Sequence, residues 1–129
     1  MKVDIDFSSV NRFSKKIQGF TRNFEKNMAQ YQKDATDKLL ARVIHHASGR
    51  PGPNIVTGRY VASFLIVSNK VVNFSPQTHR LEYGFVGNDS LGRIYYQPPF
   101  PHFRPALEEM RQEYANGIVR MIKQTWSES

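Results

Sequence analysis

The strongest pattern in the sequence is one apolar stripe at helical spacing, from about residue 9 to residue 47. Its members lie three or four residues apart and are Val10, Phe13, Ile17, Phe20, Phe24, Met28, Tyr31, Ala35, Leu39 and Val43. A mean spacing near 3.7 residues matches one face of an α-helix. The opposite face carries the basic residues Lys15, Lys16, Arg22, Lys26, Lys33 and Lys38. The pattern therefore predicts a long amphipathic helix, and Ser8 or Ser9 is its expected N-cap.

A helix of this length creates a problem of burial. At 1.5 Å per residue it is about 55 Å long, which is more than a domain of 129 residues covers by itself. Gly19 is a position where the helix can kink. Otherwise, part of the apolar stripe is expected to find its cover on a neighbouring subunit.

The middle of the chain, residues 55–100, has the composition of strands and turns. Gly49, Pro51, Gly52 and Pro53 end the first helix. Residues 62–67 and 70–74 are rich in β-branched and aromatic side chains and predict an antiparallel hairpin with Ser68-Asn69 at its turn. Residues 77–83 predict a short helix that Gly84 stops, although residues 81–86 also fit a strand.

The last part of the chain predicts a loop, an extended segment and a second helix. Residues 88–92 are typical of a loop, and the prolines in 97–101 favour extended backbone. A helix is expected from about 104 to 125, beginning near Arg104-Pro105. Its apolar stripe consists of Leu107, Met110, Tyr114, Ile118 and Met121. The expected fold is one α+β domain over 1–129, in which a long N-terminal helix and a C-terminal helix pack on a small antiparallel β-sheet.

Charge and composition narrow the classes of function. The net charge is +7, and residues 1–50 contribute ten basic and five acidic side chains. Such an excess favours nucleic acid or an acidic protein surface, or it belongs to a solvated helix face. There is no cysteine, so disulfides and thiolate zinc sites are excluded. No apolar run approaches the roughly 18–20 residues that span a bilayer, and the first residues lack a signal-peptide core. We expect synthesis in the cytoplasm and no membrane partner.

The residues that carry chemistry form no catalytic constellation. The adjacent histidines His45 and His46 point about 100° apart on a helix and cannot chelate one ion together. Surface or loop positions are expected for them and for His79 and His102. Glu82, between two apolar neighbours, is expected to pair with an arginine or to cap backbone groups. The sequence therefore predicts no enzyme, no cofactor and no metal site.

Nucleic-acid recognition has some support from aromatic residues next to basic ones. Aromatic residues lie near Arg93 and Arg104 in the sequence and could stack on bases, namely Tyr95, Tyr96, Phe100 and Phe103. No helix-turn-helix, zinc finger or RNP-type motif accompanies them. Aromatic residues beside prolines more often fix a loop to a core or to a partner. A basic nucleic-acid-binding module therefore stays an alternative.

Three segments resemble one known family. Residues 57–63 (TGRYVAS) resemble the Thr-Gly-x-Leu-Arg-x-Ser segment of siphophage neck or tail-completion proteins. Residues 80–93 (RLEYGFVGNDSLGR) are similar to their glutamate-aromatic-glycine segment and its loop. Residues 99–108 (PFPHFRPALE) are similar to their Pro-Phe-Leu-Arg-Pro-Ala-Leu segment. Order and spacing agree over most of the chain. Tyr60 and Val61 depart from the usual leucine and arginine, and His102 replaces a more apolar residue.

The resemblance implies a minor virion protein at the head–tail junction, in the neck of a tailed phage. Such a protein forms an oligomeric ring of its own copies, between head-side connector or adaptor proteins and the tail terminator or tail tube proteins. Tail terminator and head-completion adaptor are alternatives in the same class, and the ring has a possible non-specific contact with genomic DNA. The positions that match the motifs are structural: Thr57, Gly58, Arg59, Glu82, Gly84, Pro101, Arg104 and Pro105. Of these, Glu82 and Arg104 are expected to form an ion pair.

Overall fold

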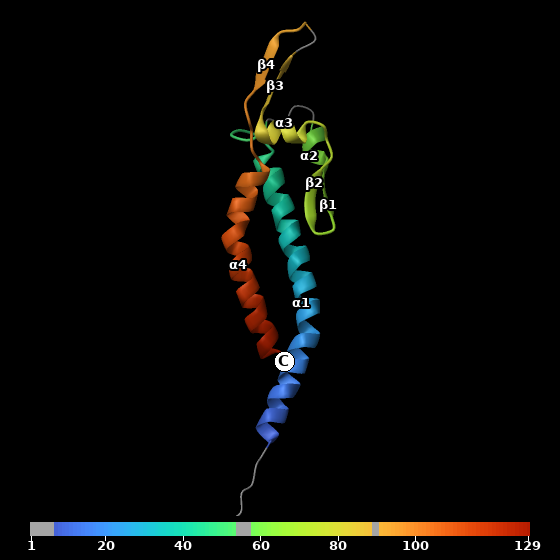
Figure 1. The fold of residues 1–129 in the computed structure, drawn as a ribbon, viewed down its shortest axis with the longest axis vertical. Helices are drawn as coiled ribbons and strands as arrows, with labels where there is room; N and C mark the ends of the chain where they lie inside the picture. The colour runs from blue at the N-terminus through green and yellow to red at the C-terminus, as the bar shows by residue number, and fades with distance from the viewer. Residues whose placement is uncertain (1–6, 54–57, 89–90) are drawn as a thin grey trace, which may run out of the picture.

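The computed structural model describes residues 7–53, 58–88 and 91–129, and its fold is α+β, as the sequence predicts. The elements are α1 (Ser8–His46), α2 (Arg59–Ala62), β1 (Phe64–Val67), β2 (Lys70–Asn73), α3 (Thr78–Tyr83), β3 (Phe85–Asn88), β4 (Ile94–Gln97) and α4 (Phe103–Ser127). Figure 1 shows an elongated molecule. α1 and α4 run antiparallel along its length, and the short elements gather at one end.

α1 is a continuous helix of 39 residues, which makes it about 58 Å long. Its N-cap position is Phe7, and no side chain caps the helix there, so the prediction of a serine N-cap is wrong. Because the chain has no break at Gly19, the helix passes beyond the end of α4 (Figure 1). The axis of α1 curves near the point where the C-terminus of the chain meets it. Gly19 is buried at this point, against Ser129.

α4 covers α1 with contacts that change character along the helix pair. Near the short elements, Arg42 of α1 forms ion pairs with Glu109 and Glu113 of α4. Further towards the C-terminal end of α4, Tyr31 of α1 donates a hydrogen bond to the carbonyl of Tyr114 over 2.6 Å. Further along, the side chains of the two helices are joined by Asn27 Nδ2 and Thr125 Oγ1 at 2.9 Å, and by rings of Trp126, Phe13 and Phe20. Ion pairs near the short elements thus give way to aromatic contacts towards the N-terminal end of α1.

The strands form two separate two-stranded sheets rather than one sheet. β1 pairs with β2, and both residues of the Ser68-Asn69 turn have positive φ, 49° and 61°, which suits a tight hairpin turn. β3 pairs with β4 from Phe85↔Gln97 to Asn88↔Ile94. The first hairpin and α3 confirm the predictions for residues 62–74 and 77–83, and the alternative strand at 81–86 is wrong over its first three residues. β4 lies earlier than the predicted extended segment, and α4 begins at Phe103.

The hydrophobic core is small and lies where the helix pair meets the short elements. Its buried apolar residues are Val43, Ala47, Phe64 and Ala106, and six partly buried residues pack around them: Leu39, Leu40, Ile44, Tyr60, Val71 and Phe103. The hairpin β1–β2 covers one side of α1 here, whereas β3–β4 projects from the end of the molecule (Figure 1). The core therefore stabilises the region where the helix pair meets the first hairpin. The N-terminal part of α1 and the hairpin β3–β4 lie outside it.

Candidate functional site

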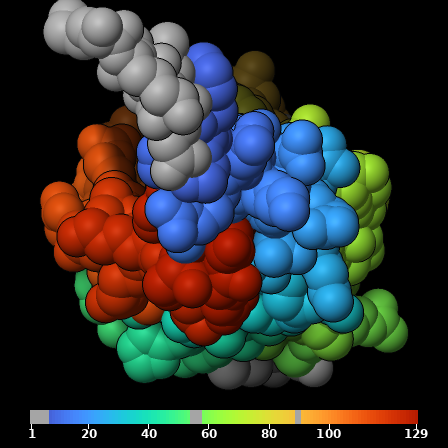
Figure 2. All heavy atoms as spheres, turned by 90° about the horizontal axis from the view of Figure 1, so that it is seen from below, coloured from blue at the N-terminus to red at the C-terminus, as the bar shows by residue number. Residues whose placement is uncertain are grey.

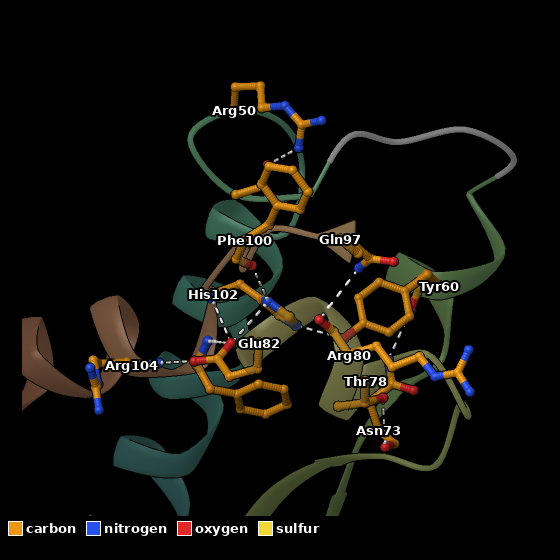
Figure 3. A network of polar contacts seen from close by, with 12 residues as sticks. Arg50, Tyr60, Asn73, Thr78, Arg80, Glu82, Gln97, Phe100, His102 and Arg104 are labelled. Atoms are coloured by element: carbon orange, nitrogen blue, oxygen red, sulfur yellow. Dashed lines mark hydrogen bonds and ion pairs between the residues drawn. The ribbon is translucent and has the colours of Figure 1, made fainter. Parts of the chain in front are cut away.

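A buried carboxylate joins α3 to the beginning of α4. Glu82, on α3, is only 8% exposed. Its Oε2 accepts backbone hydrogen bonds from His102 at 2.8 Å and Phe103 at 3.1 Å, and its Oε1 accepts one from Arg104 at 2.9 Å (Figure 3). The first N–H groups of a helix have no partner inside the helix, and its N-terminus favours negative charge. Glu82 therefore caps α4 from another element, which was one of the two expectations for it.

The expected ion pair between Glu82 and Arg104 is wrong. Arg104 contributes its backbone N–H to the carboxylate, and its guanidinium lies on the far side of that N–H (Figure 3). The side chain within reach of the carboxylate is instead the His102 ring, whose Nδ1 lies 3.1 Å from Oε2. The three backbone donors satisfy most of the acceptor capacity of Glu82 without a guanidinium.

His102 lies in the loop at the N-cap of α4 and is fully buried, so of the two expected positions the loop is confirmed and the surface is wrong for this histidine. Its Nδ1 lies 3.0 Å from the carbonyl of Phe100 and 3.1 Å from Glu82 Oε2, both of which are acceptors. Nδ1 is therefore the nitrogen that carries the proton in the neutral ring. Nε2 then accepts a hydrogen bond from the hydroxyl of Tyr60 over 2.5 Å. Every polar atom of the ring has a partner.

Tyr60, on α2, extends this network to the first hairpin. Burial raises the pKa of its hydroxyl to about 12, so the group remains a donor near neutral pH. The carbonyl of Tyr60 accepts a hydrogen bond from Asn73 at 3.1 Å, and the carbonyl of Asn73 accepts one from Thr78 at 3.0 Å. Figure 3 shows these residues around one junction. The network links α2, β2, α3 and α4.

Two of the predicted glycines have backbone conformations that other residues rarely adopt. Gly84 ends α3 with φ +84°, and a Cβ there would lie 3.0 Å from the carbonyl oxygen of Gln97 and 3.2 Å from Pro99. Gly58 precedes α2 with φ +80°, in open space. Gly84 thus allows the chain to turn sharply from α3 into β3 beside the strand that returns.

Of the remaining motif positions, Pro101 and Pro105 lie beside the same junction. Pro101 precedes His102, and Pro105 lies in the first turn of α4, where its missing N–H costs no helical hydrogen bond. Arg59 is the first residue of α2 and is exposed. Thr57 lies outside the described residues. One residue from each motif segment meets in the network: Tyr60, Glu82 and His102.

The junction fixes the positions of elements and presents no reactive group to solvent. The His102 ring and the Glu82 carboxylate are both buried, and all of their partners are groups of this chain. Among the described residues, no group of three or more His, Asp or Glu side chains is placed to hold a metal ion. The hydrogen bonds of the junction hold the beginning of α4 in place relative to α3 and the first hairpin.

Two sets of exposed apolar side chains lie away from this junction, at the two ends of the molecule. On α1, Val10 and Phe13 are 59% and 58% exposed, and Phe7 and Ile17 are also exposed. On the second hairpin, Ile94 is 84% exposed, and Val86, Tyr95 and Tyr96 are exposed as well. We call these two sets the helix tip and the hairpin arm. The sequence predicts the first from helix length, whereas no pattern marks the second.

Comparison with known proteins gives no family for this chain. No family model, no curated protein and no solved structure matches the chain. None of the described helices has a stretch that is both long and apolar enough to cross a membrane.

Proposed function

We propose that the protein is a structural subunit of the neck of a tailed bacteriophage and acts there as part of an oligomeric ring. Its partners are further copies of itself, head-side connector or adaptor proteins, and tail terminator or tail tube proteins. Its location is the virion, at the head–tail junction. Tail terminator and head-completion adaptor are variants of the same proposal.

The observation that carries this proposal is the uncovered apolar surface at both ends of a long subunit. The four residues of the helix tip have a combined exposed area of about 400 Å², because a large aromatic side chain offers roughly 200 Å² in all. A standard interface buries about 800 Å² per partner, of which roughly 57% is apolar. The helix tip therefore has nearly the apolar area that one such interface needs.

The two ends differ in structure, so a contact between them is heterologous. One end is a helix and the other is a hairpin. Heterologous contacts close into rings when the rotation between subunits permits it, and they otherwise grow into open filaments. A ring is the form that suits a unique junction between head and tail.

The motif segments support the proposed location of the ring at the head–tail junction. The segments that resemble those of neck proteins are far apart in the sequence, yet one residue of each lies in a single hydrogen-bonded network: Glu82 at a motif position, and Tyr60 and His102 at positions that depart from the motifs. This agrees with a common structural role for the segments. The resemblance, and not the geometry, is the source of the phage assignment.

Two measurements test the proposal. Light scattering and negative-stain electron microscopy of the purified protein are expected to show a closed ring, alone or after addition of a head-side connector. The neighbouring genes are expected to encode portal, capsid, tail terminator and tail tube proteins. A gene that lies in a metabolic or regulatory operon would exclude the phage assignment. A protein that stays monomeric with every neck partner would exclude the ring.

A further inference from the structure

The outer face of α1 carries a row of cations that the fold does not use. Lys15, Arg22, Lys26 and Lys33 are all exposed. Their spacings of seven, four and seven residues place them on one line along the helix. The row spans about 27 Å at 1.5 Å per residue. We call this row the basic stripe.

The side chains of the basic stripe have no partner within the described part of the chain. The ion pairs between α1 and α4 involve other cations, namely Lys38, Arg42 and His46. Lys16 is also engaged, because its Nζ donates to the carbonyl of Trp126 and lies over that ring. The stripe therefore carries four positive charges that are available to an external ligand.

The acidic residues on this part of α1 lie beside the stripe or at its end. Glu25 and Asp34 lie about a quarter of a turn away around the helix axis. Asp34 also accepts a hydrogen bond from Gln30. Asp37 follows Lys33 by one turn and ends the row.

We infer that the basic stripe is a binding surface for the phosphate backbone of double-stranded DNA. Duplex DNA presents one negative charge per about 1.7 Å of its axis, so each long side chain of a 27 Å row finds a phosphate within reach. The exposed residues between the cations include Gln18 and Ala29, which form no apolar anchor. Protein interfaces need such an anchor and are depleted in lysine. A polyanion with regular charge fits the surface better than a protein does.

The two faces of α1 thus have different partners. The apolar stripe lies on the opposite side of the helix, where α4 and the neighbouring subunits cover it. Figure 2 views the molecule from the N-terminal end of α1 and shows that helix (blue to light blue) with a broad open surface beside α4 (red). This inference uses only the charge and geometry of α1, so it does not depend on the place of the protein in a phage.

The test is fluorescence anisotropy with a labelled DNA duplex of about 30 base pairs at salt concentrations from about 50 to 200 mM. Four phosphate contacts predict a slope near −3.6 for the logarithm of the binding constant against the logarithm of salt concentration, a loss of about 150-fold over that range. The stripe variant K15Q/R22Q/K26Q/K33Q is expected to bind at least about 50-fold more weakly at the lowest salt.

A matched control removes the same number of charges from other surfaces. The variant K70Q/R111Q/R120Q/K123Q changes four exposed cations on β2 and α4, and we expect it to retain affinity within about fivefold. Glutamine is as good a helix former as lysine or arginine, and circular dichroism checks that both variants are folded. Equal losses in the two variants would overturn the inference, and so would absence of DNA binding at the lowest salt.

Two further experiments distinguish DNA binding by the basic stripe from binding of an acidic protein and from self-assembly. If poly-L-glutamate at matched charge binds as tightly as DNA, the surface belongs to an acidic protein partner and the inference is wrong. Light scattering of the stripe variant measures assembly independently of DNA. A variant that forms the same oligomer as the wild type but does not bind DNA supports the inference, whatever becomes of the neck assignment.

Discussion

The hydroxyl of Tyr60 lies 2.5 Å from Nε2 of His102, in the junction that joins α2 to the beginning of α4. Tyr60 and His102 are also positions at which the chain departs from the segments of the proposed neck-protein family, and they contact each other directly. Nδ1 of the histidine is satisfied by Phe100 and Glu82.

The first prediction concerns this pair. Tyr60→Phe removes the donor and leaves Nε2 of a buried histidine without a partner, which costs about 1–3 kcal/mol in the free energy of unfolding. Urea unfolding followed by circular dichroism measures the loss. Tyr83→Phe is the control, because Tyr83 is exposed, and we expect it to change stability by less than about 0.5 kcal/mol. Equal losses would show that the hydrogen bond is unimportant.

The second prediction is an alkaline loss of stability that depends on Tyr60. Burial raises the pKa of the hydroxyl from 10.0 in the unfolded chain to about 12 in the folded protein, and the negative charge of Glu82 adds to the rise. The folded state therefore holds this proton more tightly. Its contribution to stability is complete below pH 10 and is lost as the pH rises towards 12.

Unfolding free energies measured between pH 9 and 11.5 test this sign. The wild type is expected to lose stability over that range, and Tyr60→Phe is expected to lose less. Burial also raises the pKa of Tyr31, so part of the alkaline loss remains in the variant. Parallel curves for the two proteins would contradict the prediction.

The third prediction concerns the cap on α4. Glu82→Gln keeps the size of the side chain but removes its charge and one of its acceptor oxygens, so a backbone N–H of α4 loses its partner. We expect a loss of about 2 kcal/mol in the free energy of unfolding. Glu108→Gln is the matched control, because Glu108 is exposed near the same helix end, and its dipole effect is below about 1 kcal/mol. If both variants lose the same amount, charge alone stabilises α4 and the hydrogen bonds do not.

The fourth prediction concerns the helix tip. The double substitution V10D/I17D places two charges on the exposed apolar stripe, and we expect the ring to dissociate to monomers in light scattering because charge at the centre of an apolar contact is costly. The control N11D/Q18D adds the same charges at neighbouring positions on another side of α1 and is expected to preserve the oligomer. Equal dissociation in both variants would indicate that general repulsion is the cause.

Local patterns determined the elements of this fold. The 3.7-residue spacing of apolar side chains gave the long helix, because such spacing fits one helical face and no strand. The β-branched residues on both sides of Ser68-Asn69 gave the first hairpin in its correct place. The excess of helix length over domain size indicated that part of the stripe stays uncovered, as Val10 and Phe13 are. These conclusions needed only spacing, propensity and length.

Only the tertiary structure decided which polar groups meet. Glu82 and His102 are twenty residues apart, and the sequence pattern could not show that the carboxylate faces backbone N–H groups rather than the guanidinium of Arg104. The sequence around His102 is typical of a loop, yet the packing of Tyr60 and Phe64 around this residue buries its ring. Propensity and periodicity depend on near neighbours along the chain, whereas burial and hydrogen-bond pairing depend on how distant elements pack.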